Sequence, residues 1–435
     1  MAMQGLRSAQ RTPDMHTERT APLEGWVLYV TNHFTHPVVE AQSASPRYHL
    51  ARKLAEKGQK LLVYCPLGTH EGSPIRDFLA NLRPRRYTRG NASYLFPPLL
   101  VTPTSVGTVL TLILGALFIL LYLNVTRLKV SAQYCTTTLV GSVSAVVRMR
   151  KKVPLVANYG DPDFAREFGL ARKAFRFCED LVMTRRNASS MVYVDEVVGK
   201  YIRENFHVKN ATFMPNGGYE AGFQPPPEGS QEVVELKRRL GLEGKSVIVY
   251  AGQLTAVYRL DLLVDSAPRI ISKVPDARFL IIGGGPTLTP LMESVKAAHL
   301  EDYFVFTGSV PYDKLSPYLM LSDVSVQLLN DWCMGTKVVM YMVHRRAVVS
   351  AGNWYKQYGQ FLRSGDNSIL IPCDKHAFAE EAVRLLTDPR LRQSLGLSAW
   401  ETVSPYTWDK HADETLKLLS SACESSSPGA TSRSS

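Results

Sequence analysis

The sequence predicts an α/β protein with two Rossmann-like domains and a ligand cleft between them. Three observations support this prediction: short apolar strands alternate with amphipathic helices, the alternation starts again in the second half, and a proline-rich segment separates the halves. Strands that alternate with helices imply parallel sheets with helices packed on them. Ligands of such sheets bind beyond the carboxyl ends of the strands, so we expect the site in the cleft.

The first half opens with a βαβ unit. Trp26–Val30 is predicted to be a buried strand, residues 48–57 an amphipathic helix that ends at Gly58, and residues 61–64 the next strand. A later apolar segment, residues 154–157, predicts a further strand of the same sheet. These elements place the N-terminal Rossmann-like domain at residues 25–223, after a polar tail at 1–24 that we expect to be disordered.

The second half repeats the pattern independently. Residues 224–245 begin with three prolines and predict a linker that leads into a short surface helix. The second Rossmann-like domain then covers residues 224–404, and the Ser-rich end at 421–435 is expected to be disordered. Its predicted strands are 246–251, 278–282, 304–306 and 324–328, and its predicted helices are 261–273, 290–299 and 312–321.

Composition and charge limit the classes of function. Apolar residues make up 45% and charged residues 20%, which is typical of a globular chain. Six scattered cysteines without a C-x-x-C pair argue against a zinc ribbon and a disulfide framework. Residues 25–223 hold 25 Lys and Arg against 13 Asp and Glu, a net charge of +12. We expect an anionic partner there, and no nucleic acid, because the nucleic-acid-binding signatures are missing.

The apolar segment at 99–125 carries no charge and approaches the roughly 20 residues that span a bilayer. A single crossing would separate strands predicted to share one sheet, so two interpretations stay open. The segment is either an in-plane or re-entrant membrane helix or a buried core helix. The basic residues that follow suit anionic headgroups: Arg127, Lys129, Arg148, Arg150, Lys151 and Lys152.

Three motifs could bind a ligand, and each has a plainer interpretation. Gly283-Gly284-Gly285-Pro286 follows a predicted strand and either approaches a phosphate or merely connects the strand to a helix. Residues 214–218, Met-Pro-Asn-Gly-Gly, form a turn at the end of the first domain. Gly335-Thr336-Lys337 predicts a helix start that offers backbone N–H groups, a hydroxyl and a cation to an anion, or an ordinary capped helix.

Together these motifs resemble the GT-B glycosyltransferases, specifically glycosyltransferase family 4. Eight segments match in order and spacing: residues 49–58, 214–223, 250–254, 260–263, 282–286, 306–310, 336–349 and 406–408. The resemblance implies a retaining transferase whose second domain holds a nucleotide sugar and whose first domain holds the acceptor. It also implies that the segment around Trp408, residues 405–420, packs back on the first domain.

The sequence departs from that family at its charged donor contacts. The usual Gly-Arg after the first strand of the second domain is Gly252-Gln253, and the phosphate-binding Lys falls on Tyr258. The two family glutamates fall on Trp332 and Met340, and a thioether accepts only weak hydrogen bonds. Loss of such contacts typically lowers the rate by 10²–10³. A catalytically silent GT-B protein that binds or regulates another transferase is therefore the alternative.

The resemblance implies a set of site residues. We expect Lys337 and Asp161 to be catalytic, although Asp161 is equally suited to capping a helix. The expected acceptor contacts are His36, Arg47, Tyr159 and Asp161, and His33 and His49 lie near them in sequence, with a solvated loop as the plainer interpretation. The expected donor contacts are Gly252, Gln253, Arg259, Gly283, Gly285, Val310, Asp331, Gly335, Thr336 and Lys337.

The sequence thus predicts a retaining hexosyltransferase that moves sugar from a nucleotide-sugar donor to a lipid-linked or phosphorylated acceptor at an anionic membrane surface. No metal or other cofactor is expected, since no Asp-x-Asp motif or His/Cys cluster occurs. We expect a cytoplasmic protein that is peripherally or monotopically associated with the membrane.

Overall fold

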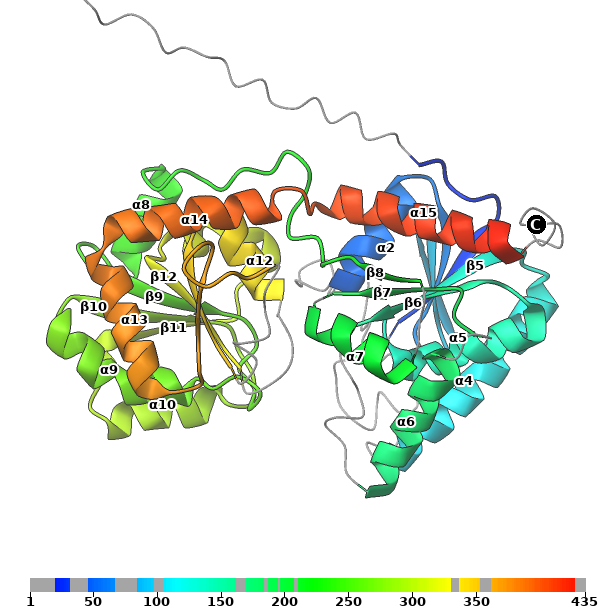
Figure 1. Ribbon diagram of the computed structural model, residues 1–435, viewed down its shortest axis with the longest axis horizontal. Coiled ribbons are helices and arrows are strands. Elements are labelled where there is room, and N and C mark those ends of the chain that lie inside the picture. Colours follow the sequence, from blue (N-terminus) through cyan, green and yellow to red (C-terminus); the bar gives the residue numbers. More distant parts are fainter. Residues whose placement is uncertain are drawn as a thin grey trace, which may run out of the picture.

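The computed structural model confirms the predicted class: two α/β domains, each built on a mostly parallel sheet, lie side by side (Figure 1). The described residues are 20–31, 46–66, 84–97, 105–160, 169–183, 187–194, 196–206, 210–329, 336–352 and 361–426.

The N-terminal sheet has eight strands among the described residues, in the order β3-β4-β2-β1-β5-β6-β7-β8. Every pair is parallel except β3 with β4. Successive buried side chains of β1 point to opposite faces, so both faces need a cover. The strands are β1 (Trp26–Val30), β2 (Lys60–Tyr64), β3 (Arg85–Arg89), β4 (Ala92–Phe96), β5 (Val130–Cys135), β6 (Leu155–Tyr159), β7 (Ser190–Tyr193) and β8 (Ala211–Phe213).

Helices supply that cover on both faces. One face packs against α4 (Ser105–Thr126), α5 (Thr138–Lys151), α6 (Gly169–Met183) and α7 (Glu196–Phe206). The other face packs against α2 (Pro46–Glu56) and α15 (Trp408–Ser426), the last helix of the chain. Figure 1 shows α15 leaving the C-terminal domain and lying along the N-terminal one.

The C-terminal sheet has six strands among the described residues, in the order β11-β10-β9-β12-β13-β14. One face packs against α9, α10 and α13, and the other against α8, α11, α12 and α14. The strands are β9 (Ser246–Ala251), β10 (Ala277–Ile282), β11 (Phe304–Gly308), β12 (Val324–Leu328), β13 (Ala347–Ala351) and β14 (Ile369–Ile371). The helices are α8 (Gln231–Arg239), α9 (Asp261–Lys273), α10 (Leu288–Ala297), α11 (Ser316–Met320), α12 (Thr336–Val343), α13 (Lys375–Thr387) and α14 (Pro389–Val403).

One predicted helix is interrupted in the structure. Residues 312–321 form a 3₁₀ turn, Tyr312–Lys314, followed by the short helix α11. Pro317 explains the break, because a proline has no backbone N–H and fits a helix only in its first turn. The helix therefore restarts immediately before this proline.

The apolar segment is the helix α4, and its two sides have different surroundings. Leu112, Ala116, Ile119 and Leu123 recur at helical spacing and are buried in the core of the N-terminal domain. The opposite side carries large apolar side chains that are between 38% and 74% exposed: Leu110, Ile113, Leu114, Leu117, Leu121 and Val125. By length and composition the part Gly107–Thr126 could span a membrane, a test that core helices of soluble proteins also pass.

The chain passes between the domains twice, and the two crossings are bonded together. The Gly218 N–H donates to the Tyr406 carbonyl at 3.1 Å, and the Trp408 N–H donates to the Tyr219 carbonyl at 3.0 Å. The His411 ring is within hydrogen-bonding distance of the Pro215 carbonyl, at 3.1 Å. The junction is therefore a small parallel pairing rather than two independent linkers.

Charges fasten this junction to α2. The Lys53 ammonium lies 2.5 Å from Glu220 on the first crossing and 3.2 Å from Asp409 on the second. Arg52 forms a second ion pair with Glu220. Lys53 is nearly buried, so its pairs are less screened than surface ion pairs. The network fixes both crossings to the same helix of the N-terminal domain.

The junction glycines are required by close packing. A Cβ atom on Gly218 would lie 2.3 Å from Cγ1 of Val339 in α12, and one on Gly217 would lie 2.6 Å from the Trp408 ring. Contacts below 3 Å force a neighbour to move. The turn predicted from Met-Pro-Asn-Gly-Gly is thus the place where α12 and α15 meet the crossing chain.

We predict that Gly218→Ala lowers the free energy of unfolding by about 1–3 kcal/mol, the usual cost of overpacking. In a Val339→Ala background the same change is expected to cost much less, because the clashing methyl is gone. Urea unfolding of the four proteins measures this coupling. Gly229→Ala is the matched control, since a Cβ there meets nothing within 4 Å. Equal costs in the two backgrounds would contradict the packing explanation.

Candidate functional site

Two glycine turns lie against each other at the carboxyl ends of β9 and β10. Gly252 follows β9 with φ 151°, and Gly283 and Gly285 follow β10 with φ 139° and 150°. The Gly252 N–H donates to the Ile282 carbonyl, and the Leu254 N–H donates to the Gly284 carbonyl, both at 2.9 Å. These turns form part of the edge at which ligands of such sheets bind.

Close packing between the two turns requires glycine at these positions. A Cβ on Gly283 would lie 1.9 Å from the Gly252 carbonyl oxygen, and one on Gly285 would lie 2.3 Å from the Leu254 carbonyl oxygen. Positive φ adds a second requirement for glycine at Gly252, Gly283 and Gly285. The structure therefore supports the connecting interpretation of the Gly283-Gly284-Gly285 motif, and its donor contact stays a prediction.

Lys337 brings a cation to the first of these turns. It is the second residue of α12, which the Tyr341 hydroxyl fastens to β9 by accepting the Ala251 N–H at 2.8 Å. A Cβ on Gly252 would lie 2.8 Å from the Lys337 Nζ, so the ammonium is directly beside the glycine turn. The start of α12 and the end of β9 thus lie together beside Gly252.

Two tyrosine rings enclose the Lys337 ammonium. Its Nζ lies 4.1 Å from the Tyr250 ring centre and 3.3 Å from the Tyr258 ring centre, and it donates to the Tyr250 hydroxyl at 2.8 Å. Such contacts stabilise a cation. Within the described residues no carboxylate pairs with Lys337. Burial therefore lowers the pKa of Lys337 well below its usual value.

Two substitutions identified in the sequence take part in this packing. Tyr258, at the position of the family's phosphate-binding lysine, places its ring on the Lys337 ammonium. Met340, at the position of the ribose-binding glutamate, is buried, and its sulfur accepts a hydrogen bond from the Tyr312 hydroxyl at 3.4 Å. One aromatic ring thus stands where the family has a second cation, and a thioether stands where it has a carboxylate.

Arg259 follows Tyr258, but its side chain is paired with other groups. The Arg259 guanidinium donates to both carboxylate oxygens of Asp261 at 2.6 to 3.0 Å and lies 3.6 Å from the Cys373 sulfur, beyond the end of β14. This internal ion pair raises the pKa of Arg259 and competes with any phosphate. Its predicted donor contact is not supported, because the side chain is already paired.

The other predicted donor residues have simpler surroundings. Gln253 is exposed, and its carbonyl accepts the Tyr250 hydroxyl at 2.6 Å. Val310 follows the end of β11 and is half-buried. Thr336 begins α12. Asp331 and Gly335 lie outside the described residues.

On the acceptor side the prediction for Tyr159 is wrong. Its side chain is 1% exposed, and its hydroxyl donates to the buried carboxylate of Glu179. Burial raises the pKa of Glu179 to about 7, although Tyr159 and Arg176 act against this shift. The alternating direction of strand side chains explains the error, because the last residue of β6 points into the helix-covered core.

The remaining acceptor residues are only partly described. Arg47 is half-buried at the start of α2, and its carbonyl accepts the Tyr29 hydroxyl at 3.0 Å. His49 is buried at the domain junction, stacked on Trp408 at 5.1 Å and beside Tyr312 at 4.9 Å, so it does not face an acceptor. Asp161, His33 and His36 lie outside the described residues.

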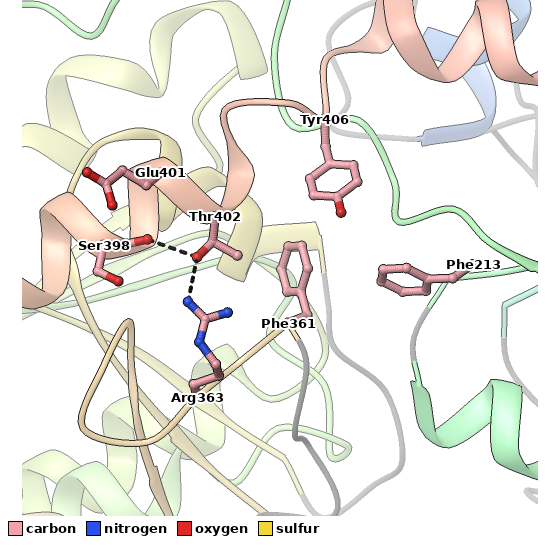
Figure 2. A pocket seen from close by; sticks show the side chains of 7 residues that line it. All are labelled: Phe213, Phe361, Arg363, Ser398, Glu401, Thr402 and Tyr406. Carbon is pink, nitrogen blue, oxygen red and sulfur yellow. Dashed lines mark hydrogen bonds between the residues drawn. The ribbon is translucent and has the colours of Figure 1, made fainter.

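An interdomain cavity of about 420 Å³ lies at the domain junction (Figure 2). It is not at the glycine turns that follow β9 and β10. Phe213 reaches it from the end of β8, and Phe361 and Tyr406 line it from the other domain. The Phe361 ring centre is 6.4 Å from that of Phe213 and 5.7 Å from that of Tyr406. None of the predicted site residues lines this cavity. Among the described residues no group of three or more His, Cys, Asp or Glu could hold a metal ion.

Tyr250 and Tyr341 belong to the candidate site and were not predicted from the sequence. The Tyr250 hydroxyl accepts a hydrogen bond from the Lys337 ammonium, and the Tyr341 hydroxyl holds α12 against β9. A signal was available: Tyr250 lies in a continuous apolar strand, β9, and its polar hydroxyl needs a partner when buried. Pattern alone did not say that this partner is Lys337, 87 residues away.

Comparisons with known proteins match part of the chain to glycosyltransferases. Residues 245–388 match the family model described as glycosyl transferases group 1. The chain is 26% identical over 175 residues to N-acetyl-alpha-D-glucosaminyl L-malate synthase of Bacillus anthracis, which covers 40% of this chain and 45% of that protein. It is 24% identical over 215 residues to a GDP-mannose-dependent alpha-(1-6)-phosphatidylinositol monomannoside mannosyltransferase of Mycolicibacterium smegmatis, covering 48% and 55%. These matches span about half the length of either relative.

The likeness to a solved structure extends over nearly the whole chain. Anabaena HepE, solved in complex with UDP, superposes with a TM-score of 0.67 at 14% identity and covers 91% of this chain and 99% of that one. At this identity the superposition shows the fold. The predicted resemblance is confirmed: the chain has the two-domain GT-B fold, and residues 245–388 match the glycosyl transferases group 1 family.

Proposed function

We propose that this protein is a retaining hexosyltransferase of the glycosyltransferase family 4 type. It takes sugar from a nucleotide-sugar donor and transfers it to a lipid-linked or other anionic acceptor at a membrane surface. The donor diphosphate lies at the glycine turns after β9 and β10 and at the start of α12. The acceptor lies on the N-terminal domain.

One observation carries the proposal: the enclosed Lys337 ammonium at the glycine turn. Lys337 is half-buried, and a cation that is partly removed from water gains from a counter-charge, which the described residues do not provide beside it. The backbone N–H groups in the first turn of α12 add partial positive charge in the same place. A diphosphate satisfies both groups together.

The same arrangement suits the chemistry. In sugar transfer the bond between the anomeric carbon and the diphosphate oxygen breaks, and the leaving diphosphate keeps the electron pair. A bond forms from the anomeric carbon to an acceptor oxygen, whose proton passes to the departing phosphate. Charge therefore grows on the diphosphate in the transition state, where a preorganised cation in a low-dielectric site is most effective.

Two further observations support the donor and acceptor classes. HepE was solved with UDP, and the Mycolicibacterium relative is a GDP-mannose-dependent enzyme acting on a phosphatidylinositol monomannoside. The N-terminal region, residues 25–223, carries a net charge of +12, which attracts anionic acceptors. We accordingly propose a cytoplasmic protein associated with the membrane surface.

We predict that UDP, GDP or another nucleoside diphosphate raises the unfolding temperature of the protein. Ligand at 100 times its Kd stabilises the folded state by about 2.7 kcal/mol. Lys337→Gln is expected to remove most of this shift and to lower the transfer rate by about 10²–10³. Thermal unfolding against a panel of nucleotides and nucleotide sugars measures both the binding and the base preference.

Lys245→Gln is the matched control for that experiment, because Lys245 pairs with Asp276 just before β9, at the opposite edge of the sheet. It should bind nucleotide like the parent protein. No shift with any nucleotide at millimolar concentration would contradict the proposal and favour the catalytically silent alternative. An unchanged shift in Lys337→Gln would contradict only the assignment of the phosphate site.

We predict that nucleotide affinity falls as the pH rises above about 7.5, where the phosphate groups no longer titrate. Burial lowers the pKa of Lys337, so the free folded protein loses this ammonium well below the pH at which an exposed lysine would. Only the charged form attracts phosphate, so binding takes up a proton in that range. Titration calorimetry in buffers of different ionisation enthalpy measures this uptake, and Lys337→Gln should abolish it.

The pH dependence of stability has the opposite sign. Between the lowered pKa of Lys337 and the ordinary value near 10.4, the unfolded chain binds the lysine proton and the folded chain does not. The contribution of Lys337 to stability therefore rises with pH across that window. An affinity that stays constant with pH would show that Lys337 is not the phosphate-binding cation.

A further inference from the structure

We propose that the outer side of α4, together with Met149 of α5 and Phe177 of α6, docks on the surface of an anionic lipid bilayer, with α4 lying in the plane of the interface. These residues are called the docking face below. The proposal rests on the proposed function for its purpose, because a lipid-linked acceptor is reached at a bilayer. Membrane binding itself is a separate measurement from nucleotide binding.

Exposed apolar side chains are concentrated on this part of the molecule. Of the eleven large apolar side chains that are exposed in the described residues, eight lie on α4, α5 and α6. Six of them follow one another along α4 from Leu110 to Val125, a length of about 22 Å at 1.5 Å per residue. Met149 is 53% exposed and Phe177 is 66% exposed. A continuous apolar strip of this kind marks an interaction surface.

The charge around the strip identifies the partner. From Ser105 to Gly160 the chain has six basic residues and no acidic one. The Lys151 ammonium donates to the Asn124 side chain, so the basic end of α5 lies beside the end of α4. An anionic headgroup layer accommodates these cations together, whereas a second copy of the domain would bring like charge to the interface. The exposed cations are Arg127, Lys129, Arg150, Lys151 and Lys152, with Arg172 and Lys173 on α6.

The fold requires that α4 lie along the membrane and not across it. Strands β4 and β5, which precede and follow α4, belong to one sheet, so both ends of the helix lie on the same side of a bilayer. The inner side of α4 also packs in the core of the N-terminal domain. Gly115 lets the helix approach β2, where the Tyr64 hydroxyl donates to the Gly115 carbonyl at 2.7 Å. An interfacial helix buries its apolar face about 5–10 Å deep, which the exposed side of α4 permits.

The position of the docking face also orients the cleft. Tyr64 is the last residue of β2, and α4 runs antiparallel to the strands that it connects, as crossover helices do. The turns of α4 before Gly115, with Leu110 and Ile113, therefore extend past the carboxyl edge of β2. That edge is the side of the sheet on which ligands bind. Docking through α4 would bring the acceptor side of the cleft to the headgroups.

The test is sedimentation of the full-length protein with vesicles of phosphatidylcholine alone or with about one third phosphatidylglycerol. The parent protein should bind the anionic vesicles, and added salt should weaken the binding. The double variant Leu117→Ser, Leu121→Ser is expected to lower the partition coefficient at least about tenfold. Its control is Val234→Ser, Leu397→Ser, which changes two exposed apolar residues of the other domain and should have no effect.

A charge variant gives an independent test that leaves the apolar strip intact. Changing Arg150, Lys151 and Lys152 to Gln should lower binding to anionic vesicles by about 100-fold, since each cation near such a surface contributes about fivefold. Neutral vesicles should be affected little. The control changes three exposed lysines of the other domain, Lys273, Lys296 and Lys375, to Gln.

Defined outcomes overturn the proposal. Absence of parent binding to both kinds of vesicle, or equal binding by the docking-face variant and its control, refutes it. Extraction by alkaline carbonate supports surface docking, whereas resistance to extraction means that α4 spans. A parent dimer in light scattering that Leu117→Ser, Leu121→Ser makes monomeric, without vesicle binding, assigns the face to self-association instead.

Nucleotide stabilisation measured on the same proteins separates this proposal from the proposed function. Both docking variants should keep the nucleotide-induced rise in unfolding temperature. Vesicle binding without any nucleotide effect would leave the docking face intact and refute sugar transfer. Nucleotide binding without vesicle binding would support the donor site and refute the docking face.

Discussion

The tight steric contact at Gly217 and Gly218 is the constraint on which the arrangement of the two domains depends. Gly218 packs on Val339 of α12, and Gly217 packs on Trp408 at the start of α15. The helix that holds Val339 also carries Lys337, two residues earlier. The donor-site cation is therefore positioned by the same contact that joins the domains. A shift of the junction would move α12 and, with it, the ammonium beside Gly252.

The substitutions in the donor site are consistent with one another. A glutamate in place of Met340 would put a carboxylate in the apolar cluster that contains Tyr341 and Val343, and burial without a partner would disfavour its charge. A lysine in place of Tyr258 would bring a second ammonium to the one already enclosed by Tyr250, and like charges repel. With aromatic and thioether groups at these positions, a single cation can be desolvated there. The site therefore depends on one strongly placed charge rather than several weaker ones.

The sequence predicted several elements of the second domain to the residue because its strands are short, apolar and bounded by glycine turns. Ser246–Ala251, Asp261–Lys273 and Val324–Leu328 have the bounds expected from pattern alone. The site was predicted less well, since its contacts are long-range. Arg259 was expected to contact the donor, because Asp261 is a good first-turn helix residue and its pairing with Arg259 is not evident from the sequence. Tyr159 was misassigned because the direction of a terminal strand side chain depends on the register of the whole sheet.

The helix α4 shows why periodicity alone could not decide between core and membrane. A helix that is apolar on every side gives no amphipathic signal, whichever surroundings it has. In the structure one side of α4 packs on the sheet and the other does not. Ile119 is fully buried, whereas Leu117 and Leu121 on the opposite side are more than 60% exposed. Core packing accounts for the first set and leaves the second without a structural reason, since a polar outer side would fold as well. Its persistence over four turns, in a stretch from residue 105 to 160 that holds six cations and no acidic residue, is what a surface selected for lipid contact requires.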